Sequence, residues 1–303
     1  MFNRYFKKAL FKGAFFALAF IGSSSVYAVD SCELDEKSNV EKAIVNWVYD
    51  GDTLLVTDLK GKNKRKIRVI GIDTPEVKHH QQKAQLYGAK AREELRVLLK
   101  GNSFDGVSDD SSNNAYQIFL EFDKEKYDRY KRLLAHVYLA NGMNISEWLL
   151  QRGFAKTLII PPNVKHVGCY KKAERQAQRQ KLRLWKLESN QIKTVQDLKS
   201  RSKGYVRLRG KVSRIKKQKK TLILELESQS KKPVRIRIKK KNLRYFKAIE
   251  PDKLVAQEVI VSGVLKYKKG KRTITLNHSS QLERVSAINN HSKVIAPTVM
   301  WSK

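Results

Sequence analysis

The sequence predicts an α+β protein built from two small β-barrels with helices packed against them. Two sets of five short segments, rich in β-branched residues and separated by turn residues, are typical of antiparallel strands. The charge of the chain changes abruptly between the two sets, which indicates two regions with different roles. A length of 303 residues suits about two domains, and a hydrophobic content of 41% is sufficient for two buried cores.

The first set of elements predicts a closed barrel over residues 40–186. Two turn signals, Asp50-Gly51 and Lys60-Gly61, separate the first three strands. The expected strands are residues 40–48, 53–57, 66–72, 116–122 and 133–139, and the expected helices are residues 86–99, 145–151 and 171–184. Five strands with intervening helices are typical of the OB fold, a small barrel closed by five strands. A Ser-, Asp- and Asn-rich loop is expected over residues 102–114.

The second set predicts another OB-like barrel over residues 204–285. Its expected strands are residues 205–215, 221–227, 234–238, 259–266 and 273–276. A helical connection over residues 243–248 follows the third strand, which is the OB order. We expect residues 187–203 to connect the two barrels, and the tail, residues 286–303, has no clear pattern.

Positive charge is concentrated in the second region. The chain has 63 Lys and Arg against 29 Asp and Glu, a net charge of +34 with a pI near 10.1. Residues 29–192 hold 29 basic and 22 acidic side chains, whereas residues 193–285 hold 28 and 7. Such an excess predicts a polyanionic partner: DNA or RNA, or alternatively an anionic envelope surface. No obligate protein partner is expected.

Alternation along two strands of the second barrel predicts where this charge would act. Apolar residues fill the barrel, so their basic neighbours point outward: Arg207, Arg209, Arg235 and Arg237. These four are the expected nucleic-acid contacts of the second barrel. Three tyrosines are expected either to stack on bases or to pack in the core: Tyr205, Tyr245 and Tyr267.

The N-terminus predicts export. Four basic residues precede an apolar run over residues 14–22, and Val26-Tyr27-Ala28 provides small residues at a cleavage site. We expect residues 1–28 to be a cleaved signal peptide, leaving 29–39 as a short N-terminal segment of a periplasmic or extracellular protein. The alternative is an uncleaved anchor, although the run is shorter than the roughly 20 residues that span a bilayer.

Two cysteines are too few for a disulfide-built scaffold, and they lack the grouping of a zinc site. In an oxidising compartment Cys32 and Cys169 could pair and tie the N-terminus to a later helix. The alternative is two unpaired thiols.

Candidate catalytic groups lie at the ends of the predicted strands. Asp52 and Asp73 provide hard oxygen ligands, which select Ca²⁺ or Mg²⁺. Glu76 can act as a base, while Arg68 and Arg132 can make forked contacts with phosphate. Taken alone, each residue is better explained as a surface turn residue. Their joint occurrence predicts phosphodiester hydrolysis.

Four segments carry a resemblance to a known family: Asp50-Gly51-Asp52-Thr53, Arg68 to Glu76, Asp128 to Arg132 followed by Leu134-Ala135, and Gly153 to Lys156. With them, residues 40–186 resemble the staphylococcal nuclease (thermonuclease) family. The resemblance implies that Asp52, Asp73 and the Thr74 carbonyl hold Ca²⁺, that Glu76 activates water, and that Arg68 and Arg132 bind the phosphate. It also implies an endonuclease that leaves 3′-phosphate ends on DNA or RNA.

The chain departs from the family at two places. Lys131 replaces a usual glycine and could either add a phosphate contact or crowd the loop. The neighbouring Tyr130 matches a family tyrosine near the bound nucleotide. A second tyrosine expected at residues 158–160 is replaced by aliphatic residues. The alternatives to an enzyme are a catalytically weak nucleic-acid-binding protein of the envelope and a surface adhesin that uses the basic module.

Overall fold

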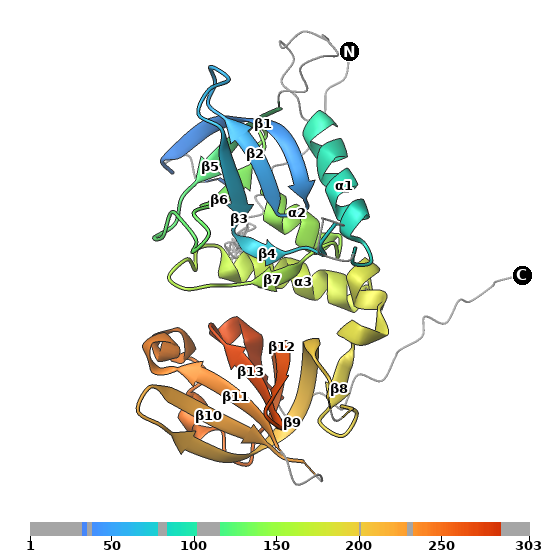
Figure 1. Cartoon of the computed structure of the whole chain (residues 1–303), viewed down its shortest axis with the longest axis vertical. Helices are drawn as coiled ribbons and strands as arrows, with labels where there is room; N and C mark the ends of the chain where they lie inside the picture. Colours follow the sequence, from blue (N-terminus) through green and yellow to red (C-terminus); the bar gives the residue numbers. More distant parts are fainter. Residues whose placement is uncertain are drawn as a thin grey trace, which may run out of the picture. The chain divides into compact units, whose positions relative to one another are not determined.

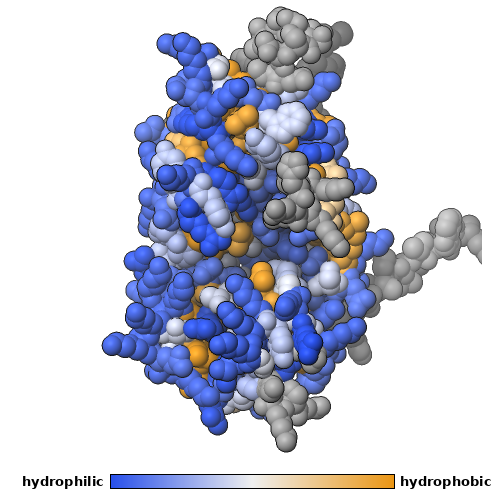
Figure 2. All heavy atoms as spheres, in the orientation of Figure 1, coloured by the Kyte–Doolittle hydropathy of each residue, from blue (hydrophilic) through white to orange (hydrophobic). Residues whose placement is uncertain are grey.

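We describe a computed structural model over residues 32–34, 38–77, 84–101, 116–199, 201–228 and 233–285 (Figure 1). The predicted signal peptide, the loop 102–114 and the tail 286–303 lie outside the described residues. Within these residues, no helix is both long and apolar enough to cross a membrane. Hydrophilic side chains dominate the face of the molecule shown in Figure 2.

The first barrel is closed by five strands, as the alternation predicts. They are β1 (Val40–Asp50), β2 (Thr53–Thr57), β3 (Arg65–Val69), β5 (Tyr116–Glu121) and β6 (Leu133–Tyr138). They follow one another around the barrel in the order β1-β2-β3-β6-β5, and only the β3–β6 pair is parallel. This is the OB order, so the predicted fold class is confirmed for this part of the chain.

The predicted strand 66–72 is interrupted. β3 ends at Val69, and β4 (Gly71–Asp73) leaves the barrel to pair with β7 (Lys156–Leu158). Gly71 makes this change of direction with a φ of 91°, a conformation that favours glycine. The separate β4–β7 ribbon carries Asp73 away from the barrel wall and opposite Lys156.

Three helices flank the first barrel in the described residues: α1 (Gly88–Gly101), α2 (Ile145–Gln151) and α3 (Val167–Arg179). α1 lies beside β1, and α2 packs against α3 (Figure 1). α3 is the helix that we expected at residues 171–184, and it begins and ends earlier than expected. It stops because Lys181 and Arg183 have left-handed φ values of 51° and 40°.

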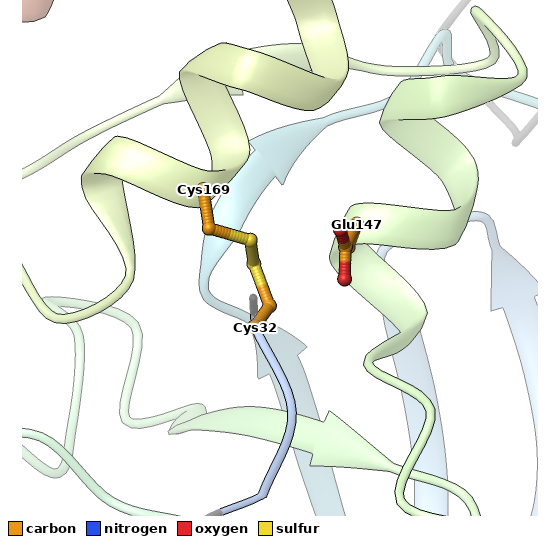
Figure 3. A group of neighbouring side chains, drawn as sticks. All are labelled: Cys32, Glu147 and Cys169. Carbon is orange, nitrogen blue, oxygen red and sulfur yellow. A yellow bond between two sulfur atoms is a disulfide. The ribbon is translucent and has the colours of Figure 1, made fainter. Parts of the chain in front are cut away.

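The core of the first barrel is formed by inward-facing aliphatic residues such as Leu54, Ile67 and Leu120, which are fully buried. Cys32 and Cys169 are buried beside this core and are joined by a disulfide with a Cα–Cα distance of 5.7 Å (Figure 3). The predicted pairing is confirmed. It ties the segment before β1 to α3.

The second barrel is also closed by five strands: β9 (Gly204–Lys217), β10 (Thr221–Leu226), β11 (Val234–Lys239), β12 (Glu258–Lys268) and β13 (Lys271–Leu276). Their order is β9-β10-β11-β13-β12, and the β12–β9 pairing closes the ring. The 3₁₀ helices over Lys240–Phe246 and Pro251–Lys253 follow the third strand. The strand order is that of the first barrel.

Two short strands extend this sheet beyond the ring. β14 (Leu282–Arg284) pairs with β12, and β8 (Ile192–Thr194) pairs with β9. β8 belongs to the segment 187–203, where we expected only a connection. Val195, which follows β8, is buried in the second core, so this part of the segment packs with the second barrel.

Candidate active site

The turn between β1 and β2 positions the first candidate ligand. The Asp50 carboxylate accepts a hydrogen bond from the Asp52 amide at 3.0 Å, which fixes the turn. The Asp52 carboxylate in turn accepts bonds from the Thr53 hydroxyl at 3.1 Å and the Thr74 amide at 2.8 Å. A Cβ on Gly51 would lie 2.7 Å from Cγ2 of Thr74. The turn therefore packs directly against the residue that follows β4.

Arg68 joins the two candidate aspartates. It lies on β3 opposite Thr53, and its Nη2 is 3.1 Å from Oδ2 of Asp52 and 3.5 Å from Oδ1 of Asp73. Its Nη1 donates to the carbonyls of Val69 and Ile72, at 2.8 and 3.0 Å. The backbone at the break between β3 and β4 thus orients the guanidinium toward both carboxylates.

The two carboxylates lie close enough to repel each other, with the Asp52 side chain buried and the Asp73 side chain 57% exposed. Burial, opposed by Arg68, raises the pKa of Asp52 to about 6, and the Asp50 charge adds to the rise. The pKa of Asp73 is also raised, by desolvation and by the Asp52 charge. The positive charge of Arg68 therefore does not fully neutralise the two carboxylates, and a second cation would be attracted to this position.

The residues present fit a divalent metal with oxygen ligands. Asp52 and Asp73 are both within 3.5 Å of one Arg68 nitrogen. The backbone of Thr74, whose carbonyl is the expected third ligand, is held beside Asp52 by the bond from its amide, and its hydroxyl oxygen is buried with no hydrogen-bond partner. This donor set contains only oxygen atoms, which Ca²⁺ and Mg²⁺ prefer. The expected ligands Asp52, Asp73 and Thr74 are brought together.

Glu76 lies two residues beyond Thr74 and is partly buried. Its amide donates to Oε1 of Gln85 at 3.2 Å, and its carbonyl accepts from the Gln85 amide at 2.9 Å. These two bonds attach the segment after β4 to the residues that precede α1. Gly88 is required beside it, because a Cβ there would lie 2.4 Å from the Glu76 carbonyl oxygen.

Arg132 is held by Asp128 through two hydrogen bonds. Its Nε donates to Oδ2 of Asp128 at 2.7 Å, and its amide donates to Oδ1 at 2.9 Å. The resulting tight loop contains Tyr130, a residue that is 64% exposed, and Lys131, whose left-handed φ of 62° explains why a glycine suits this position. A cavity of about 660 Å³ is lined by Arg68, Tyr130 and Arg132, so the two candidate phosphate-binding arginines face one space.

Arg129 was not identified from the sequence. Its guanidinium donates to the Tyr130 hydroxyl and lies 4.6 Å from the ring centroid, and it lines the same cavity. In the sequence, Arg129 is only a further basic residue within the Asp128–Arg132 segment. This position alone does not indicate a contact with the Tyr130 ring.

The four arginines of the second barrel divide into two pairs. Arg209 and Arg237 are exposed, as predicted. Arg235 donates to Glu225 at 3.1 Å, and Arg207 donates to Gln178 at 3.0 Å while lying over Trp185. None of the four is buried, in agreement with the predicted outward direction, but Arg207 and Arg235 are each held by a neighbouring polar group. That these arginines bind nucleic acid stays a prediction.

The tyrosines of the second barrel differ as well. Tyr245 packs against the second core, which favours the core alternative for this residue. Tyr205 and Tyr267 are partly buried.

Comparison with known proteins identifies relatives of the first barrel. A family described as Staphylococcal nuclease homologue matches residues 66–187. The thermonuclease of Staphylococcus intermedius is 32% identical over 146 residues, which cover 48% of this chain and 76% of that protein. The thermonuclease of Staphylococcus hyicus is 34% identical, over 46% of this chain and 72% of that protein. The SPbeta prophage-derived endonuclease YokF of Bacillus subtilis is 36% identical, but the match spans only 41% of its length.

Proposed function

Because the chain belongs to the staphylococcal nuclease family, we propose that it is a metal-dependent endonuclease that hydrolyses phosphodiester bonds of DNA or RNA. The observation that carries the proposal is the cluster of Asp52, Asp73 and Arg68, beside a cavity that Arg68 shares with Arg132. Binding alone would require the cations and not the paired carboxylates. The names of the thermonucleases and of the endonuclease YokF support the same activity.

We propose that Asp52, Asp73 and the Thr74 carbonyl hold Ca²⁺, which supplies a Lewis acid when bound. Within this site Glu76 accepts a proton from the attacking water. Arg68 and Arg132 donate to the phosphate oxygens as negative charge develops on them. The Asp128 carboxylate keeps Arg132 oriented before substrate arrives, because its contacts fix both the loop and the guanidinium. The products would carry 3′-phosphates.

A cleavage assay tests this proposal. The protein without its first 28 residues is incubated with plasmid, single-stranded DNA and RNA, with Ca²⁺, with Mg²⁺, or with chelator. We expect cleavage that requires a divalent cation, and loss of cleavage with retained binding in Glu76→Gln. Absence of cleavage by the wild type with every cation would instead support a binding protein.

The second barrel is proposed to bind the nucleic acid through its exposed arginines. Arg209 and Arg237 have no acidic partner among the described ion pairs, unlike Arg235. The region of residues 193–285, which contains this barrel and has a net charge of +21, would hold a polyanion mainly through its phosphates. An anionic envelope surface is the competing ligand, and vesicles of anionic lipid in a competition assay would distinguish the two.

We propose that the protein acts in the periplasm or outside the cell. The basic and apolar pattern of residues 1–28 supports export, and the Cys32–Cys169 disulfide supports an oxidising compartment. Detection of the processed protein in the periplasmic or culture fraction tests this assignment.

A further inference from the structure

A second group of titratable side chains lies on the first barrel, formed by different residues from the candidate active site. Glu121 at the end of β5 is directly opposite His136 on β6, so both side chains point to the same face. His166, at the N-terminus of α3, approaches this face. One donor atom from each of the three residues lies within 4.8 Å of the other two.

This group is almost completely enclosed. The side chain of His136 is 0% exposed, that of Glu121 is 3% exposed, and that of His166 is 13% exposed. Two residues beyond Glu121, the Asp123 carboxylate is 8% exposed and faces His136. Tyr138 and Tyr170 cover the group from β6 and α3 and are fully buried.

One ring nitrogen of His136 makes no hydrogen bond. Its Nδ1 is hydrogen-bonded to the Tyr170 hydroxyl at 2.7 Å, which fixes the ring. Its Nε2 is buried and has no hydrogen-bond partner, and the nearest carboxylate oxygen, Oδ2 of Asp123, is 4.0 Å away. A buried donor or acceptor without a hydrogen bond is unfavourable, so the position of this nitrogen indicates a site for a bound group.

The rest of the group resembles an outer shell around an ion. A ligating imidazole commonly bonds a neighbouring polar group through its other nitrogen, as Nδ1 of His136 does with Tyr170. His166 has a left-handed φ of 59°, and its side chain makes no capping bond to α3. Its Nε2 instead contacts Oε2 of Glu121 at 2.7 Å, so this backbone conformation directs the imidazole into the group.

The charges suit a divalent ion. Two carboxylates, Glu121 and Asp123, face the group, and one cation opposes them: Lys165, whose Nζ is 2.6 Å from Oε1 of Glu121. The Lys165 side chain is 43% exposed, so it can withdraw into solvent.

We propose that Glu121, His136 and His166, with Asp123 as a further oxygen ligand, form a second metal site that takes Zn²⁺. Two imidazoles with carboxylates are ligands of borderline cations such as Zn²⁺, whereas Asp52 and Asp73 offer only oxygen to a hard cation. The bound ion displaces Lys165 and joins β5, β6 and the start of α3. This site is structural and does not depend on the proposed nuclease activity.

Zinc titration of the full disulfide-bonded protein tests the site. The protein is stripped with chelator and titrated with ZnCl₂ by calorimetry in saturating Ca²⁺, which occupies the oxygen-only site. We expect one zinc per chain and a higher melting temperature on binding. His136→Gln and His166→Gln should each weaken the affinity by more than about 100-fold, since even loss of an outer-shell partner costs about 10- to 100-fold.

Two further variants separate this site from zinc bound elsewhere. His278→Gln removes a histidine of the second barrel and should bind zinc as the wild type does. Lys165→Gln removes the competing cation, whose side chain is 43% exposed, and should tighten binding about tenfold, which remains measurable if the histidine variants fail to fold. No zinc uptake by the wild type, equal affinity in His136→Gln, or unchanged affinity in Lys165→Gln would overturn the proposal.

Discussion

At the scale of the residue, Asp52 carries an electrostatic cost that Arg68 offsets only in part. The carboxylate is buried beside Asp50 and near Asp73, and its pKa is raised to about 6. An acid whose pKa is higher in the folded protein than in the unfolded chain binds more protons when folded. Its contribution to stability is therefore present at low pH and is lost as the pH rises from about 4 to about 6.

Asp52→Asn should remove the loss of stability that ionisation of Asp52 causes. The amide retains the shape of the side chain and carries no charge, so without metal the variant should gain stability relative to the wild type as pH rises from 4 to 7. The expected gain is about 2 kcal/mol, since each pKa unit corresponds to about 1.4 kcal/mol. Urea unfolding in chelator at both pH values measures it. Ca²⁺ should stabilise the wild type more than the variant, and a stability difference independent of pH would contradict this account.

Arg132→Lys tests whether the bidentate contact of the guanidinium is needed for catalysis. A lysine keeps the charge but cannot reproduce both the contact with Asp128 and a bidentate contact with phosphate. We expect turnover to fall by about 100-fold or more, as for other positioned transition-state donors. Single-turnover cleavage measures the rate, and a melting curve close to that of the wild type serves as control. A rate within a few-fold of the wild type would show that Arg132 makes no such contact.

At the scale of the element, the sequence predicted the barrels well because their strands alternate regularly. The break between β3 and β4 was missed, since Ile67 to Ile72 is a continuous apolar run apart from Arg68 and Gly71. The break is caused by packing from a distant element: a Cβ on Gly71 would lie 2.2 Å from the Tyr170 ring of α3. The residue pattern around Gly71 does not reveal this contact, because Tyr170 is distant in the sequence.

For the candidate site, too, local motifs could be predicted from the sequence and contacts between distant residues could not. Asp52, Arg68, Asp73 and Thr74 could be predicted because they lie at strand ends within short motifs, and the structure brings them together. The contacts that hold Arg207 and Arg235 could not be predicted. Alternation gives the face to which a side chain points, and it does not give the neighbour that it meets there.

The turn between β1 and β2 gives a prediction at this scale. Gly51→Ala places a methyl group 2.7 Å from Thr74, which is buried and β-branched and so cannot move away easily. We expect a loss of about 1–3 kcal/mol in stability, the usual cost of overpacking, and weaker Ca²⁺ binding. Thermal melts with and without Ca²⁺ measure both. Gly101→Ala, where a Cβ meets nothing within 4 Å, is the matched control and should keep wild-type Ca²⁺ binding.

At the scale of the whole molecule, two barrels of one strand order carry different chemistry. The first holds the clustered carboxylates and the disulfide, and the second holds most of the net charge. A concentration of phosphate-binding charge apart from the catalytic groups increases affinity without changing the chemical step. The contribution of each barrel can therefore be separated by the salt dependence of binding.

Arg209→Gln combined with Arg237→Gln should lower both the affinity for nucleic acid and its dependence on salt. Each lost phosphate contact reduces the slope of log affinity against log salt by about 0.7 for single strands, so the double variant should lose about 1.4. Fluorescence anisotropy with a labelled oligonucleotide in chelator, which prevents cleavage, measures the slope. Arg235→Gln is the control: its guanidinium is already paired with Glu225, so removing it should change the slope much less. Equal effects of the paired and the exposed arginines would mean that phosphates do not bind at this face.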